Sequence, residues 1–516
     1  FWLKASAPAS AQSPLRAGMD RWSGHKGNLE RSLLTARARI GTLLECGTVT
    51  DESVRTELEE IAALIRSIEM NVGKKRLGES RLKHPTLDFL ASGLPDDQAV
   101  NAQQLLEVYT DCDLVAAEGN KAISPRKLEG SHPEFRRKST QELDARVASV
   151  LSSPGASELL EEAGSLEFNA LAFGALPYVH SQPIFVLFTY LEGKLRLSKQ
   201  LRDLGQVADA VTFHSRLMHF MERMDSLYRA NPYHNSAHAA DVIMTLEWFF
   251  QSRYLQERHS SLDHLMALIA GAIHDVGHPG TSNLFQSKTM SPMAIRYNDK
   301  SILENMHVSL SFEAMRDDPN CNWFAMLPLD FRQEGSSASV PPVNLSQYVR
   351  KGLVHMVLAT DMAKHAQGVQ ELKIFVEDQA ETSGEDQNHK QEALDIKLTV
   401  LGTILHAADI SSPTKPRPIM LQWTQRILEE FWNQGDEEQR RGLTISPLCN
   451  REAERIAVPK GQIGFITYVV QPLFAPLTQL MPEVKKAYDL LLENRAFWEE
   501  EDKEHATFEK IFGVDA

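Results

Sequence analysis

Two groups of histidine and aspartate residues lie close together near the middle of the chain. The first is in Tyr-His-Asn-Ser-Ala-His-Ala-Ala-Asp at residues 233–241, and the second is in His-Asp-Val-Gly-His at residues 274–278. Each segment separates two imidazoles by four residues, which places them on one face of a helix. Imidazole nitrogens and carboxylate oxygens together suit a divalent metal, and two ions can share one carboxylate.

A third segment, residues 405–410, adds His406 and Asp409. A single pair of histidines at this spacing is more often structural than metal-binding. All three segments, however, are rich in alanine, glycine or apolar residues, where a polar side chain is costly unless it is paired or bound to a metal. Small neighbours also let helices approach closely. Together the three segments predict a metal centre.

Six motifs, taken in their order along the chain, resemble those of the class I cyclic-nucleotide phosphodiesterases. The resemblance runs from about residue 165 to the last residue and leaves out the first 160 residues. The motifs are Tyr-His-Asn-x-x-His-Ala-x-Asp (233–241), His-Asp-x-x-His-x-Gly (274–280), Tyr-Asn-Asp-x-Ser-x-Leu-Glu-x-x-His (297–307), Ala-Thr-Asp-Met-x-x-His (359–365), His-Ala-Ala-Asp-Ile-Ser (406–411) and Gln-Ile-Gly-Phe (462–465).

The fold class follows from the residue pattern. From about residue 165 onward the pattern is helical almost throughout, with little alternation of period two, which predicts an all-α domain. The resemblance implies a compact multi-helix catalytic domain at residues 165–516, with two metal ions in one deep pocket. We expect residues 1–27 to be a linker and residues 28–160 a helical N-terminal region for regulation or dimerisation.

The resemblance also implies how the metals are bound. The first ion takes His238, His274, Asp275 and Asp409, and the second shares Asp275 and is otherwise held by water. Two nitrogens and two oxygens suit zinc, whereas a hydrated, oxygen-rich site suits magnesium or manganese. A metal-bridging hydroxide would then attack the phosphorus of a 3′,5′-cyclic nucleotide, cyclic AMP or cyclic GMP. The 3′ phosphoester bond breaks and a 5′-nucleoside monophosphate results.

Other histidines and carboxylates match family positions around the metals. His234 has the position of the general acid, one helical turn before the ligand His238, and would protonate the leaving 3′ oxygen. Asn283 and His307 fit either a role in the site or a purely structural one. The side chains expected to surround the metals and their bound waters are His278, Glu304, Asp361 and His406.

The far end of the pocket is expected to bind a purine. By resemblance, the amide of Gln462 reads the base edge while Phe465 and Ile427 hold its two faces. Residues 423, 427 and 431 are spaced by four, a pattern that most often indicates helix core, and only the resemblance makes them pocket residues. The other residues expected in the substrate pocket are Trp423, Phe431, Tyr233, Asn283 and Ser412.

Two departures from the family bear on the choice of nucleotide. Relatives selective for cyclic AMP often have Asn where this chain has Ser412. They also place Tyr three residues before the tryptophan, where this chain has Met420. A methionine cannot donate the hydrogen bond that would hold the glutamine amide in one orientation. The chain is therefore expected to accept both cyclic AMP and cyclic GMP.

Two other functions fit the sequence less well. A metal phosphohydrolase of the His-Asp type that acts on non-cyclic nucleotides is less compatible with Gln462 and Phe465. A catalytically silent cyclic-nucleotide sensor would typically lack a metal ligand or the acid, and both are present.

Composition narrows the class of protein and the cellular compartment that we expect for it. The 516-residue chain has a formal net charge of −15, which argues against nucleic acid as a partner, and an apolar fraction of 42%, enough for a substantial core. No apolar run approaches the ~20 residues that a membrane span needs. We expect a cytoplasmic protein, or the cytosolic part of a longer one tethered upstream to a membrane. The four cysteines lack disulfide or metal spacing: Cys46, Cys112, Cys321 and Cys449.

Two apolar stripes at coiled-coil spacing lie in the N-terminal region, one within residues 28–45 and one within residues 54–72. An isolated helix this short is marginal in water, so each stripe needs a partner. The partner is either another part of this chain, as in a helical hairpin, or a second copy. We predict a homodimer that depends on residues 1–75.

Overall fold

A computed structural model of the chain describes residues 140–513 except for 180–181, 333–341 and 382–389. The predictions for residues 1–139, namely the linker, the two apolar stripes and the dimerising role, lie outside the described residues and stay predictions. Within the described ranges the chain is all-α, as predicted. An isolated β-bridge between Phe331 and Val343 is the nearest approach there to a strand.

The helical core begins before the point expected for the catalytic domain. Leu143 and Val147 of α6 (Thr140–Leu151) and Leu160 of α7 (Pro154–Leu160) are buried in the same hydrophobic core as the later helices. The expected boundary between residues 160 and 165 therefore does not separate two cores. The next helices are α8 (Ala170–Gly174), α9 (Pro183–Leu195), α10 (Leu197–Asp203), α11 (Ala210–Leu227), α12 (Ser236–Phe250), α13 (Arg253–Arg258) and α14 (Ser261–Ile273).

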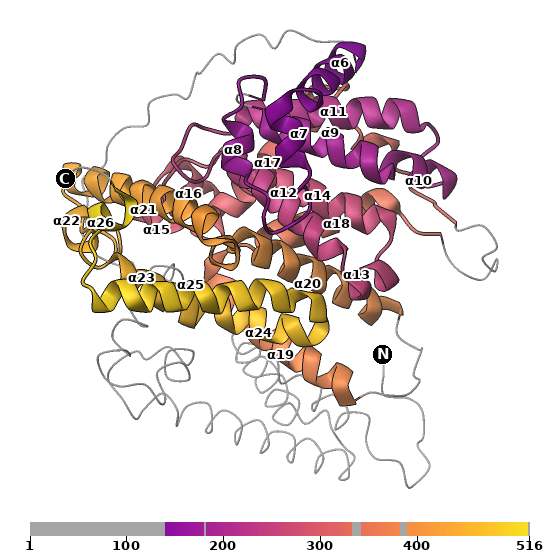
Figure 1. The fold of residues 1–516 in the computed structure, drawn as a ribbon. Coiled ribbons are helices and arrows are strands. Elements are labelled where there is room, and N and C mark those ends of the chain that lie inside the picture. Colours follow the sequence, from indigo (N-terminus) through magenta and orange to yellow (C-terminus); the bar gives the residue numbers. More distant parts are fainter. Residues whose placement is uncertain (1–139, 180–181, 333–341, 382–389, 514–516) are drawn as a thin grey trace, which may run out of the picture. The chain divides into compact units, whose positions relative to one another are not determined.

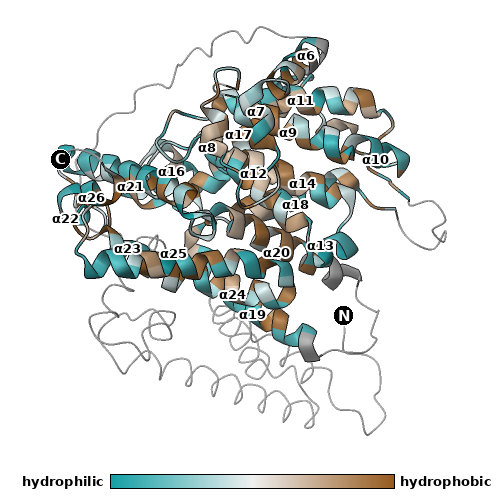
Figure 2. Cartoon of the chain, in the orientation of Figure 1, coloured by the Kyte–Doolittle hydropathy of each residue, from teal (hydrophilic) through white to brown (hydrophobic). Residues whose placement is uncertain are grey.

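The helices α12 and α14 form a closely packed central pair (Figure 1). Gly271 of α14 makes this approach possible, because a Cβ atom there would lie 2.8 Å from Cδ1 of Leu246 on α12. Ser260 begins α14 with a capping box in which its side chain and that of Asp263 each accept a backbone hydrogen bond. Figure 2 shows hydrophobic residues concentrated along α14, as burial on most sides requires.

The middle of the chain supplies the other walls of the site. Here α20 packs against α18, α12 and α14. The elements are α15 (Asn283–Lys288), α16 (Pro292–Tyr297), α17 (Ile302–Asp317), the 3₁₀ turn η1 (Phe324–Met326), α18 (Leu345–Leu358), the 3₁₀ turn η2 (Met362–Lys364), α19 (His365–Glu381), α20 (Lys390–Asp409), the 3₁₀ turn η3 (Ser412–Thr414) and α21 (Arg417–Arg440).

The C-terminal helices close the pocket from the other side. A π-helical turn, η4 (Ile466–Val470), precedes Pro472, which has no N–H to donate to the carbonyl of residue 468, so a wider turn fits at this point. The other elements are α22 (Arg451–Glu454), α23 (Val458–Phe465), α24 (Gln471–Leu480), the 3₁₀ turn η5 (Pro482–Val484), α25 (Lys485–Lys503) and α26 (Phe508–Phe512).

One segment corrects the expectation that nothing here is of membrane length. The continuous helical run Val458–Leu480 has 23 residues and is apolar enough to cross a membrane by length and composition. Its apolar residues pack inward, with Val469, Phe474 and Leu477 fully buried. A core helix of a soluble protein can have the same length and composition, so this run is weak evidence for a membrane span.

Candidate functional site

The four residues expected to bind the first ion come from three helices that pack together. His238 lies in the first turn of α12, which Asn235 caps by accepting hydrogen bonds from two backbone N–H groups. His274 and Asp275 directly follow α14, and Asp409 is the last residue of α20. Because α12 packs on both α14 and α20, side chains distant in sequence meet at one point.

The ligand atoms of these four residues form a compact set. The Nε2 atom of His238 lies 3.0 Å from Oδ1 of Asp409 and 3.5 Å from Oδ2 of Asp275. The Nε2 atom of His274 lies 3.2 Å from the same Asp275 oxygen, 3.4 Å from the Asp409 oxygen and 3.3 Å from Nε2 of His238. Neighbouring ligands bound at about 2.1 Å to one ion are about 3.0–3.4 Å apart. The set therefore fits one divalent ion.

Charge and hydrogen bonding at His274 point to the same conclusion. Its Nδ1 donates to the backbone oxygen of Gly271 at 2.8 Å, which turns Nε2 toward the two carboxylates. Burial alone would lower the pKa of His274, but Asp275 and Asp409 raise it well above its ordinary value. The carboxylates thus favour a positive charge at this point, which a metal ion would supply.

His234 lies beside this set without belonging to it. Its Nδ1 is hydrogen-bonded to Oε1 of Glu430, whose Oε2 accepts the backbone N–H groups of Tyr233 at 2.8 Å and His234 at 3.0 Å. Burial alone would lower the pKa of His234, but the charges of Glu430 and Asp275 raise it to about 9. Burial would raise the pKa of Glu430, but His234 lowers it to about 2. Both values describe an imidazolium–carboxylate pair at neutral pH.

Glu430 is a candidate functional residue that was not predicted from the sequence. It is only 3% exposed, on the same helix as the pocket residues Ile427 and Phe431. The sequence does contain a signal for Glu430. This residue lies three residues after Ile427 and next to Phe431, which places it on the inner face of an amphipathic helix. A carboxylate buried there needs a hydrogen-bonding or charged partner. Its partner, 196 residues away, is not evident from the sequence.

His278 stacks on His234, with ring centroids 3.9 Å apart. Its Nδ1 accepts the N–H of Gly280 at 3.1 Å. Burial and the positive charge of His234 lower the pKa of His278 well below its ordinary value. A neutral His278 with Nδ1 engaged in this way offers Nε2–H as a donor. That property fits the expected hydrogen bond to metal-bound water.

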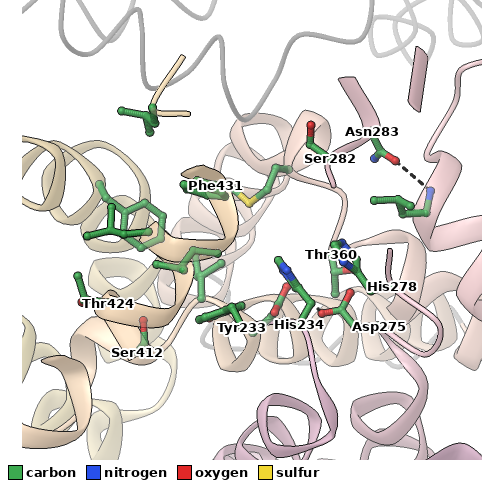
Figure 3. Close-up of a pocket in the computed structure, with 18 of the residues that line it drawn as sticks. Tyr233, His234, Asp275, His278, Ser282, Asn283, Thr360, Ser412, Thr424 and Phe431 are labelled. Carbon is green, nitrogen blue, oxygen red and sulfur yellow. Dashed lines mark hydrogen bonds and ion pairs between the residues drawn. The ribbon is translucent and has the colours of Figure 1, made fainter. Parts of the chain in front are cut away.

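Asn283 orients a carboxyl group in the pocket wall. Its Nδ2 lies 3.1 Å from both carboxyl oxygens of Glu304. Its Oδ1 accepts the N–H of Leu303 at 2.9 Å, which is the dashed line at Asn283 in Figure 3. Burial, together with the charge of Asp361, raises the pKa of Glu304 to about 8. Asp361 itself accepts a hydrogen bond of 2.6 Å from the hydroxyl of Ser301. Asn283, Glu304 and Asp361 thus form a polar part of the pocket wall.

His307, for which the sequence fits either a role in the site or a structural role, contacts the proposed ligand set. Its Nδ1 donates to the backbone oxygen of Val276 at 2.8 Å, and its Nε2 lies 3.5 Å from Oδ1 of Asp275. Burial lowers the pKa of His307 to about 4, so the ring is neutral. It therefore approaches one oxygen of Asp275, whereas His274 approaches the other.

One pocket contains both the polar cluster and the expected purine residues. Figure 3 shows His234, Asp275 and His278 at one end and Ser412 and Thr424 at the other. The predicted residues that line the pocket are Tyr233, His234, Asp275, His278, Asn283, Glu304, Asp361, Asp409, Ser412, Ile427, Phe431, Gln462 and Phe465. The ligands His238 and His274 lie behind this surface, with side chains 3% and 0% exposed.

Trp423 is not among the residues that line the pocket, contrary to the prediction. It is 1% exposed, and its ring centroid lies 5.4 Å from that of Tyr233 and 5.8 Å from that of His238. A helical turn has 3.6 residues, so side chains spaced by four residues do not lie directly above one another. Trp423, Ile427 and Phe431 are therefore progressively rotated around the axis of α21. Trp423 thus packs behind the ligands, and Thr424 takes its place in the pocket.

His406 also differs from the prediction, because it faces another cavity. Its Nε2 lies 2.9 Å from Nδ1 of His365, and both rings line a hollow between α18, α19 and α20. A residue three positions before Asp409 points about 60° away from it around the helix. His406 therefore does not reach the pocket.

The amide of Gln462 has no hydrogen-bond partner among the described residues of the chain. Met420, which replaces the tyrosine of some relatives, is buried on α21, where its sulfur lies 3.5 Å from the hydroxyl of Thr424. Either end of the Gln462 amide is thus available for a hydrogen bond.

The family profile of 3′5′-cyclic nucleotide phosphodiesterase matches residues 233–491. The chain is 38% identical over 286 residues to the probable 3′,5′-cyclic-AMP phosphodiesterase pde-4 of Caenorhabditis elegans, a match covering 55% of this chain and 40% of that protein. It is 36% identical over 288 residues to the 3′,5′-cyclic-AMP phosphodiesterase 4C of Rattus norvegicus, covering 55% and 50%. The chain therefore spans half or less of the length of these relatives.

Solved structures have the same fold. The structure of LmjPDEB1 in complex with IBMX aligns with a TM-score of 0.57 and 26% identity, covering 70% of this chain and 98% of that one. The phosphodiesterase domain of the RhoPDE fusion protein from the choanoflagellate Salpingoeca rosetta aligns with a TM-score of 0.55 and 25% identity, covering 70% and 99%.

Proposed function

The chain belongs to the 3′5′-cyclic nucleotide phosphodiesterase family, and on this premise we propose that it hydrolyses the 3′ phosphoester bond of 3′,5′-cyclic nucleotides to 5′-nucleoside monophosphates. The observation that carries the proposal is the placement of His234, paired with Glu430, beside a four-residue ligand set in one pocket. Phosphodiester hydrolysis needs an activated water and a proton for the leaving oxygen. The four-residue ligand set would hold the metal that activates the water, and the His234–Glu430 pair would supply the proton.

The ligand set supports zinc at the first site, with His238, His274, Asp275 and Asp409 as ligands. The second ion, magnesium or manganese, would share Asp275 and keep most of its waters near Glu304, Asp361 and His278. When bound, two such ions activate water as a nucleophile near neutral pH and offset the negative charge of the phosphate.

His234 would deliver the proton to the 3′ oxygen as that oxygen leaves. Its Nδ1 is engaged with Glu430, so Nε2 is the nitrogen left to donate, and that atom lies 4.0 Å from Oδ2 of Asp275. This nitrogen therefore lies beside the proposed ligands, where it would protonate the leaving oxygen of a phosphate bound there. Glu430 keeps the imidazole charged and fixes its orientation through the backbone of the same segment.

The other end of the pocket would bind the base. Ile427 and Phe465 line it on two different helices, α21 and α23, which suits an apolar clamp around a flat ring. Gln462 is the amide in this part of the pocket that the family resemblance assigns to the base edge.

We further propose that cyclic AMP and cyclic GMP are both substrates. The curated relatives named above are cyclic-AMP phosphodiesterases, which supports cyclic AMP. An amide without a hydrogen-bond partner can present either its oxygen to the amino group of adenine or its NH₂ to the carbonyl of guanine. This freedom supports cyclic GMP as well.

The test is hydrolysis of each nucleotide by the purified chain, with zinc and magnesium and again after chelation. Release of the 5′-monophosphate that is lost on chelation and restored by metal is expected. Absence of hydrolysis of both nucleotides by the metal-loaded protein would overturn the proposal. Turnover of non-cyclic nucleotides alone would favour the other phosphohydrolase function.

A further inference from the structure

A lysine and an aspartate are buried together close to the ligand set, and neither has a role in the reaction described above. Lys415 is fully buried and Asp241 is 3% exposed. The Nζ atom of Lys415 lies 2.8 Å from Oδ1 of Asp241 and 3.0 Å from the hydroxyl oxygen of Thr245. A buried ion pair contributes little to stability, because removing two charges from water costs about as much as their attraction returns.

The pair joins the two segments that supply facing metal ligands. Asp241 lies three residues after His238 on α12, and Lys415 ends the short loop that follows Asp409 at the end of α20. The ligand atoms of His238 and Asp409 are themselves 3.0 Å apart. A second link between the same two segments therefore lies about one helical turn from the ligands.

The loop between Asp409 and Lys415 is held on its other side as well. The Nδ2 atom of Asn494 on α25 donates to the backbone oxygens of Pro413 at 2.8 Å and Lys415 at 2.7 Å. Ser412, in the middle of the loop, lines the pocket. The loop thus carries a ligand at one end, a pocket residue at its centre and the buried lysine at the other end.

We propose that Lys415 and Asp241 are positioning residues that fix the loop after Asp409 against α12 and so set the geometry and affinity of the first metal site. The inference rests on the proposed function in one respect, namely that His238 and Asp409 bind a common ion. Apolar contacts allow sliding, whereas a hydrogen-bonded ion pair specifies one register of the two segments. An error of about 1 Å in such a register is enough to impair a catalytic site.

The main test is the double variant Asp241→Asn/Lys415→Met, which removes both charges while keeping the size of both side chains. Replacing a buried pair by uncharged groups of similar volume is usually neutral for folding. We expect a folded protein whose affinity for zinc, measured by competition with a chelator, is lower by roughly 10–100-fold, the usual effect of losing a group that supports a ligand. Turnover should fall in parallel at limiting zinc.

The matched control is Arg146→Met/Glu222→Gln, which removes an ion pair of 3.1 Å between α6 and α11 whose carboxylate is fully buried. It should keep wild-type zinc affinity. Wild-type zinc affinity in the folded Asp241→Asn/Lys415→Met protein would overturn the proposal. If that double variant does not fold, Thr245→Val takes its place; it removes the 3.0 Å contact to Lys415 and the hydrogen bond of 2.9 Å that the same hydroxyl donates to the backbone oxygen of Asp241. A several-fold loss of zinc affinity in Thr245→Val then supports the proposal, and none overturns it.

The failure of the proposed function would look different. In that case the wild-type protein would bind zinc no better than Asp409→Ala, whatever the state of Lys415. If zinc binding depends on Asp409 but not on Lys415 and Asp241, only the positioning role of Lys415 and Asp241 is overturned.

Discussion

The Nε2 atom of His234 lies 4.0 Å from Oδ2 of Asp275. The proposed proton donor and the carboxylate proposed to be shared by two metals are thus neighbours, yet His234 is engaged by Glu430 and stands outside the ligand set. In the proposed function, metal binding and proton transfer therefore depend on different side chains. Mutations should separate the two.

Removal of Asp409 tests the metal site. The Asp409→Ala variant loses an oxygen that lies 3.0 Å from Nε2 of His238 and 3.4 Å from Nε2 of His274. We expect loss of turnover together with depletion of zinc, measured by elemental analysis of the purified protein. Asp489→Ala, an exposed residue paired with Lys485, is the control and should change neither quantity. Near-normal activity and zinc content in Asp409→Ala would refute the ligand assignment.

Removal of His234 tests the acid. Because His234 is not a ligand, His234→Ala should keep both metals and lose roughly 10²–10⁴-fold in rate on cyclic nucleotides, the range typical of general acid catalysis. A nitrophenyl phosphodiester has a leaving group that needs no proton, so its hydrolysis should be affected much less. Equal losses on the two substrates would show that His234 acts in another way.

The partner of the acid should control the pH dependence. The charge of Glu430 helps raise the pKa of His234 to about 9, and the acid must be protonated to act, so activity falls as the pH rises through that value. In Glu430→Gln the pKa should return toward about 6.5, which lowers the rate relative to wild type by roughly 100-fold at pH 9. The rate at pH 6 should change far less. A pH–rate profile identical to that of the wild type would rule out this role for Glu430.

The grouping of the four proposed ligands was predictable because its chemistry is local in sequence. His274 and Asp275 are adjacent, and His238 and Asp409 stand in alanine-rich helices where an unpaired polar group is costly. The all-α fold followed from helical periodicity for the same reason. Both depend on short-range patterns that a sequence displays directly.

The residues that were missed or misplaced depend on tertiary packing. Glu430 becomes meaningful only when α21 brings it to the backbone of residues 233–234, and Lys415 only when its loop meets α12. The predictions for Trp423 and His406 were wrong because a rotation of some tens of degrees around the helix axis decides which cavity a side chain faces. No short motif encodes these angles.

Base recognition should be separable from the chemistry of the metals and the acid. Gln462 lines the pocket on α23, away from both groups, and its amide has no hydrogen-bond partner among the described residues. In Gln462→Ala a buried base edge would lose its partner at a cost of about 1–3 kcal/mol, which corresponds to a rise in KM of roughly 5–150-fold. Because the amide can serve either purine, KM should rise for cyclic AMP and cyclic GMP alike, with zinc content unchanged. The control Gln422→Ala removes an exposed amide from α21 and should leave KM as it is. A rise for one nucleotide only would mean that the amide is fixed in one orientation, and no rise for either would mean that another group reads the base.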